Sequence, residues 1–173
     1  MEKKLEDMIA EIDAELEKLE KIKREITPEE KEISKCIKEK LTKRNIKFEC
    51  TPDMPRKIDI TCTIENKFFH MRIYVCDRKI NLEIIFPFRV QCNSVAIVSL
   101  FITQFNLGKA FTHLNLDIND GELTMGYTYM LDNATEFNEN YFEIYMDSLI
   151  VCTLEIYSKL HQLAVGKVSR DIW

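Results

Sequence analysis

The sequence has few of the residues that interrupt regular structure or mark a familiar catalytic loop. Among its 173 residues only 4 are glycine, 4 are proline and 1 is tryptophan. It has no G-x-G-x-x-G turn, no phosphate-binding loop and no G-x-S-x-G elbow around a nucleophilic serine. We therefore expect no catalytic residues and no cofactor, and we interpret the chain as a regular, non-enzymatic protein.

Metal-binding and redox motifs are also missing. No two of the 6 cysteines form a C-x-x-C pair, and the histidines His70, His113 and His161 lie far apart. The cysteines are Cys36, Cys50, Cys62, Cys76, Cys92 and Cys152. Because most of them lie in apolar patterns, we expect reduced thiols that serve as small core residues, and we expect no metal site.

Targeting and membrane signals are absent from the sequence as given. The chain starts with charged residues rather than an apolar leader, and its most apolar segment, 144–154, is short and interrupted by Asp147. The net charge of −5 argues against non-specific nucleic-acid binding, which requires clustered lysine and arginine. These features predict a cytoplasmic protein without nucleic-acid or membrane partners.

The first 27 residues carry an apolar seam with alternating steps of four and three. Its members are Leu5, Ile9, Ile12, Leu16, Leu19 and Ile26. The pattern predicts an amphipathic helix over 1–27 that binds a partner through this seam. Two interpretations stay open: the helix docks on its own domain, or it self-associates as a coiled coil.

A second helix should begin directly after this seam. Thr27 and Glu30 form a capping box around Pro28, which suits the first helical position. Ile33, Ile37 and Leu41 then form one apolar stripe, and the helix should end near Asn45.

From residue 46 the apolar pattern changes to a period of two, which is typical of half-buried strands. Three alternating runs, at 58–64, 69–75 and 80–86, predict an antiparallel meander with turns at 66–67 and 77–78. Residues 47–50 could add a short edge strand. We expect the aromatic residues of these strands, Phe68, Phe69, Tyr74, Phe86 and Phe88, to belong to the core.

A uniformly apolar stretch, 95–105, follows a cap at Asn93 or Ser94 and predicts a buried helix ending near Gly108. Two more strands should flank a hairpin marked by Asp117, Asp120, Gly121 and Glu122. We expect a type I′ turn at Asp120-Gly121 rather than a calcium loop, because the glycine falls one position too early for an EF-hand. A long closing helix is expected over 138–165.

The pattern Asn106-Leu107-Gly108, followed by Leu114 to Leu123 with its Asp-Gly-Glu hairpin, resembles the YbjN family of bacterial proteins. The family's glycine before this strand is replaced here by Thr112. The resemblance implies an α+β domain over 28–165, in the order α-βββ-α-ββ-α with about five to six strands, followed by a tail over 166–173. It also implies a fold similar to that of the dimeric chaperones of type III secretion.

These observations predict a cytoplasmic protein-binding adaptor or chaperone-like regulatory module that forms a homodimer. Its partner would be a polypeptide client or a second copy of the chain. One alternative is a structural oligomer assembled by the N-terminal coiled coil. Another is a ligand sensor or an enzyme with a pocket that the sequence does not reveal.

Overall fold

The computed structural model describes residues 26–51, 54, 56–76, 78–131 and 137–167. The elements are α2 (Pro28–Lys43), β1 (Phe48–Glu49), β2 (Lys57–Ile64), β3 (Lys67–Cys76), β4 (Lys79–Arg89), a 3-10 turn (Cys92–Ser94), α3 (Val95–Leu107), β5 (Thr112–Leu116), β6 (Glu122–Met130) and α4 (Glu139–Ala164). They form an α+β fold around a six-stranded antiparallel sheet with the order β1-β2-β3-β4-β6-β5. The predicted fold class and element order are confirmed.

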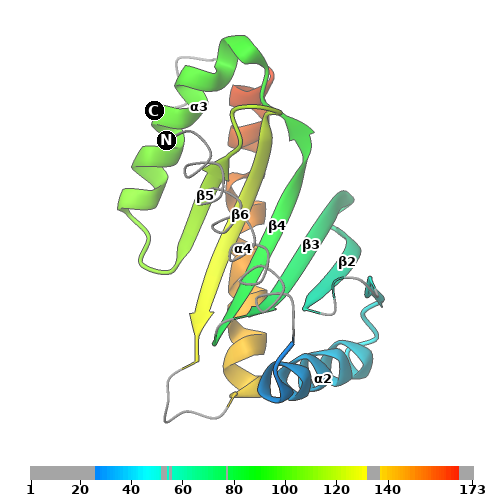
Figure 1. The fold of residues 1–173 in the computed structure, drawn as a ribbon. Coiled ribbons are helices and arrows are strands. Elements are labelled where there is room, and N and C mark those ends of the chain that lie inside the picture. Colours follow the sequence, from blue (N-terminus) through cyan, green and yellow to red (C-terminus); the bar gives the residue numbers. More distant parts are fainter. Residues whose placement is uncertain (1–25, 52–53, 55, 77, 132–136, 168–173) are drawn as a thin grey trace, which may run out of the picture.

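The sheet has one covered face and one open face. The long helix α4 runs behind the sheet in Figure 1, and α2 crosses at its lower end. Alternate strand residues point toward these helices and form the core. These buried residues include Ile58, Ile60, Met71, Ile73, Leu82, Ile84, Leu123 and Met125 from the sheet, together with Phe142, Met146 and Leu149 from α4. No helix among the described residues covers the other side, which we call the open face.

The ends of α2 and α4 agree with the sequence signals. Thr27 accepts a hydrogen bond from the Glu30 amide, and the Glu30 carboxylate accepts one from the Thr27 amide, as the capping box requires. The Asn138 side chain accepts hydrogen bonds from the first turn of α4. That helix ends before Gly166, whose φ of 72° stops the chain from continuing as a helix.

Helix α3 differs from its prediction. It is a helix, but only Val98 and Phe101 are buried, and Leu107 is 83% exposed. The cause is its position: α3 lies beside the edge strand β5 and contacts α4, rather than lying between layers (Figure 1). Ser94 precedes the helix without making a side-chain cap, so the expected capping hydrogen bond is also absent.

Two turns differ from the sequence prediction. The β2–β3 turn is centred on Glu65 and Asn66, with φ values of 49° and 61°, one residue earlier than expected. Positive φ at both positions is typical of a type I′ turn. At the β5–β6 hairpin only Gly121 has positive φ, so the predicted hairpin exists but the type I′ assignment at Asp120-Gly121 is wrong.

The N-terminal seam from Leu5 to Leu19 lies outside the described residues, as does most of the 166–173 tail. Ile26, the last seam residue, is half-buried just before α2. Within the described ranges, none of the helices is both long and apolar enough to cross a membrane.

A candidate interaction surface on the open face of the sheet

The strand register gathers polar side chains on the open face. Asp59 on β2 lies opposite Arg72 on β3, which lies opposite Glu83 on β4. The same row continues through Gly126 on β6 to His113 on β5. Side chains directly opposite each other on one face are near neighbours, so this row runs across five strands.

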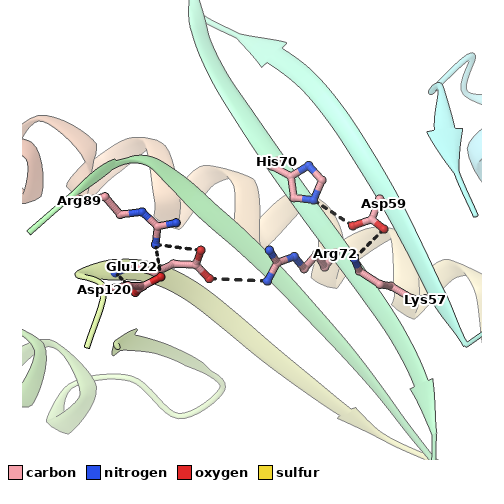
Figure 2. Close-up of polar contacts among 7 residues, drawn as sticks. All are labelled: Lys57, Asp59, His70, Arg72, Arg89, Asp120 and Glu122. Carbon is pink, nitrogen blue, oxygen red and sulfur yellow. Dashed lines mark hydrogen bonds and ion pairs between the residues drawn. The ribbon is translucent and has the colours of Figure 1, made fainter. Parts of the chain in front are cut away.

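At one end of the row, a carboxylate is held by two basic partners. Asp59 Oδ2 is 2.9 Å from Lys57 Nζ, and Asp59 Oδ1 is 2.9 Å from His70 Nε2 (Figure 2). The Asp59 side chain is only 15% exposed. Its two partners satisfy both carboxylate oxygens and fix the imidazole of His70 on the face.

Outside this row, toward the end of β4, a second group joins β3, β4 and the β5–β6 hairpin. Glu122 Oε2 is 2.9 Å from Arg89 Nη1, and Glu122 Oε1 is 3.6 Å from Arg72 Nη1. Arg89 Nη1 is also 3.2 Å from Asp120 Oδ2. Figure 2 shows the two arginines approaching Glu122 from opposite sides. Half-exposed pairs of this kind contribute modestly to stability but fix side-chain positions.

The hairpin is positioned by a close backbone contact. The Val90 amide donates a 2.9 Å hydrogen bond to the Gly121 carbonyl. An added Cβ at Gly121 would lie 2.6 Å from the Val90 carbonyl oxygen, so only glycine fits. This contact brings Asp120 and Glu122 to the end of β4, where Arg89 binds both.

Arg72 is stretched across the face. Its neighbours across the strands are Asp59 and Glu83, yet its guanidinium reaches over β4 to Glu122. Ile85, on the same face of β4, is only 9% exposed. Arg72 Nε is buried and has no hydrogen-bond partner, so the guanidinium has unused donor capacity.

The far end of the row is shaped by Gly126. An ideal Cβ there would lie 2.4 Å from His113 Nε2, so the imidazole lies directly over the glycine. A larger residue at 126 would displace the ring. The absence of a side chain at Gly126 therefore lets His113 lie against the open face.

Two apolar side chains lie at the margins of the open face. Phe68 on β3 is 56% exposed and Met130 on β6 is 59% exposed. The expectation that Phe68 is a core residue is therefore wrong, whereas Phe69 and Phe86 are buried as predicted. Arginine, phenylalanine and methionine are among the residue types enriched in protein interfaces, although here the charged groups occupy the centre of the face and the apolar side chains its margins.

A second exposed surface lies on the helical side. Helix α3 has no charged residue, and Leu100, Leu107 and the nearby Phe111 are exposed. The adjacent edge of β5 is closed, because the Asn106 side chain accepts a hydrogen bond from the Leu114 amide and donates one to the Leu114 carbonyl. This side-chain contact occupies the amide and carbonyl of Leu114, in the middle of β5, which another strand would need for pairing there.

The structure brings together only some of the residues that the sequence singled out. His70 and Arg72 share the open face, and His113 shares it with Asn115, because alternate residues of a strand point to the same side. The hairpin residues Asp120 and Glu122 join the Arg89 group, whereas Asp117 accepts a hydrogen bond from Asn119 within the loop. Sequence reasoning missed Arg89 and Glu83, whose neighbours on β6 follow from a β4–β6 pairing between strands that are not consecutive.

The cysteine prediction requires a correction. All six cysteines are free thiols, but none is fully buried, and Cys50 and Cys92 are exposed. The apolar context of the sequence overstated their burial because several lie near strand ends. Among the described residues, no group of three or more histidine, cysteine, aspartate or glutamate side chains is arranged to hold a metal ion.

Comparisons with known proteins support the fold. No protein-family model matches the chain, and no curated protein matches its sequence. The structure is similar to the crystal structure of YbjN from E. coli, a protein described there as a proposed transcription regulator, with a TM-score of 0.56. The two share 14% sequence identity over 73% of this chain and 90% of that chain. The chain therefore has a YbjN-like fold, as the sequence resemblance implied.

Proposed function

We propose that this protein is a non-enzymatic, protein-binding module that contacts a polypeptide partner through the open face of its sheet. The observation that carries the proposal is the open face itself, which spans the sheet and is covered by no described helix. Its polar row, with Phe68 and Met130 at the margins, offers both hydrogen-bonding and apolar contacts.

The charge of this face favours a protein partner over nucleic acid. Lys57, Arg72 and Arg89 are each paired with a carboxylate. Nucleic-acid binding would require unpaired basic groups that release counterions from phosphates. If the regulatory role described for YbjN extends to this chain, the open face supports regulation through protein contacts rather than through DNA.

Self-association is a second candidate function, and helix α3 favours it. An uncharged helix with exposed Leu100 and Leu107 exposes apolar area that a second copy could cover. The exposed apolar side chains of two copies could pack against each other, so we propose a homodimer whose open faces both stay accessible. We place this module in the cytoplasm, with the free thiols as support.

The test compares bulky charges on the two sides of the protein. Thr61→Arg and Thr128→Arg add an arginine at exposed positions of the open face. Ser148→Arg and Ser158→Arg add the same side chain at exposed positions of α4 and serve as matched controls. Each variant is used to capture partners from cells that express the native protein, with quantitative mass spectrometry as the measurement.

We expect the open-face variants to lose a partner that the wild type and both α4 variants retain. Urea unfolding of all four variants checks that exposed substitutions leave stability within about 0.5 kcal/mol of the wild type. Loss of the partner only in the α4 variants would refute the proposal. Equal capture by all four variants would refute it as well.

A further inference from the structure

Glu83 differs from the other carboxylates on the open face because it has no partner. Asp59, Asp120 and Glu122 are each paired with a basic side chain. Within the described part of the chain, the Glu83 side chain makes neither a hydrogen bond nor an ion pair. It is nevertheless half-buried on β4, near the middle of the sheet.

The cross-strand neighbour that should neutralise Glu83 points elsewhere. Arg72 lies directly opposite Glu83, but its guanidinium extends to Glu122 instead. On the other side of Glu83 the neighbour is Gly126, which has no side chain to offer. The register therefore leaves a partly desolvated carboxylate without a compensating charge, and such a group gains free energy when a cation binds it.

A hollow of about 460 Å³ opens beside this carboxylate. Glu83, Asp117 and Glu122 contribute to its wall, and Asn115 and Thr124 add further oxygen atoms. No lysine, arginine or histidine lines it. Arg72 and Arg89 already bind Glu122, so it is mainly the Glu83 carboxylate on this wall that favours a positively charged group.

The remaining wall of the hollow is apolar. Leu116 and Ile118 line it, and Ile118 is 70% exposed at the tip of the β5–β6 hairpin. A long aliphatic stem that ends in a cation would match both parts, because its carbons would contact Leu116 and Ile118 while its head reaches Glu83. Lysine and arginine side chains combine such an aliphatic stem with a cationic head group.

We propose that this hollow binds a lysine or arginine side chain of the polypeptide partner, with Glu83 as the principal acceptor. The inference rests on the proposed function, because it assigns a chemical class to the partner of the open face. Glu122 contributes less, since Arg72 and Arg89 already occupy its two oxygens. Asp117 also contributes less, because its Oδ1 accepts two hydrogen bonds from Asn119.

The test uses defined probes rather than the natural partner. Capped Ala-Lys-Ala and Ala-Arg-Ala peptides are titrated into the ¹⁵N-labelled full chain, with capped Ala-Gln-Ala as the uncharged control. The amide of Gly126 reports on the hollow, because it is the cross-strand neighbour of Glu83 and one of only 4 glycines. Glu83→Gln keeps the shape and removes the charge, and Glu155→Gln, at an exposed position of α4, is the matched variant.

We expect the cationic peptides to shift the amides of Gly126, Thr124 and Asn115, and the uncharged peptide to leave them in place. Glu83→Gln should weaken this binding at least threefold, whereas Glu155→Gln should leave it unchanged. Shifts of equal size with the uncharged peptide, or equal affinity in Glu83→Gln, would overturn the inference.

The two proposals fail in distinguishable ways. If cationic peptides bind through Glu83 but Thr61→Arg and Thr128→Arg still capture every partner, the hollow is a cation-binding site and the proposed function is refuted. If those arginine variants lose a partner but no peptide binds at Glu83, the proposed function is supported and the assignment of the hollow is refuted.

Discussion

Replacing Gly121 by alanine tests how the β5–β6 hairpin holds Asp120 and Glu122 on the open face. Gly121 has a φ of 74°, and the left-handed conformation costs an alanine about 1–2 kcal/mol. The new Cβ would also lie 2.6 Å from the carbonyl oxygen of Val90, which belongs to the backbone and has little freedom to move.

Relief of that contact must separate the hairpin from β4. The separation breaks the hydrogen bond from the Val90 amide to the Gly121 carbonyl, a loss of about 1 kcal/mol. Together these effects predict a decrease of about 2–3 kcal/mol in the free energy of unfolding. In a chain of this length the corresponding decrease in Tm is about 5–10 °C.

Gly108→Ala is the matched control for this substitution. Gly108 has a φ of −92°, and an added Cβ would meet only the Phe105 carbonyl oxygen at 3.7 Å. We expect no loss, or a gain of up to about 1 kcal/mol from reduced freedom of the unfolded chain. Urea unfolding followed by circular dichroism measures both variants. A Gly121→Ala protein as stable as the wild type, or a Gly108→Ala protein equally destabilised, would refute the reasoning.

Three further predictions concern other parts of the fold. Asn106→Ala leaves the Leu114 amide and carbonyl unpaired at the sheet edge, so urea unfolding should show a loss of about 1–3 kcal/mol in stability. Gln104→Ala, at an exposed position of α3, is the control and should leave stability unchanged. Burial and a hydrogen bond with Tyr145 raise the pKa of Tyr127, so the folded state holds this proton more tightly than the unfolded state. The contribution of this proton to the free energy of unfolding should therefore be fully present below about pH 10 and decline above it. Tyr127→Phe should make that decline less steep in unfolding curves measured from pH 9 to 11. In thiol labelling followed by mass spectrometry, the exposed Cys50 and Cys92 should be modified first. Cys62 should react more slowly, because burial raises the pKa of its thiol. Uniform labelling rates would contradict the burial described.

The elements that sequence predicted well are those specified by local signals. The capping box at Thr27 and Glu30 needs only neighbouring residues, and α2 begins where it predicts. Alternation of apolar and polar residues likewise identified β2, β3 and β4. These patterns reflect the geometry of a single element and require no knowledge of its neighbours.

The errors have a common physical origin in contacts between distant segments. A uniformly apolar run predicts a helix, but whether α3 is buried depends on the exchange of β5 and β6 in the sheet order, which leaves α3 beside an edge strand. The same exchange places Glu122 beside β4, within reach of Arg72 and Arg89. Neither consequence can be read from spacing along the chain. The unpaired state of Glu83 depends on the same pairing.

Site-specific photo-crosslinking tests the central claim most directly. Benzoylphenylalanine is placed at Thr128, an exposed position on the open face, and in a second protein at Ser158, an exposed position on α4. Both proteins are irradiated in cells of the organism that naturally expresses this protein, and adducts are identified by mass spectrometry. Binding through the open face predicts a defined polypeptide adduct at Thr128 that is absent at Ser158. Adducts that form only at Ser158, or equally at both positions, would contradict it.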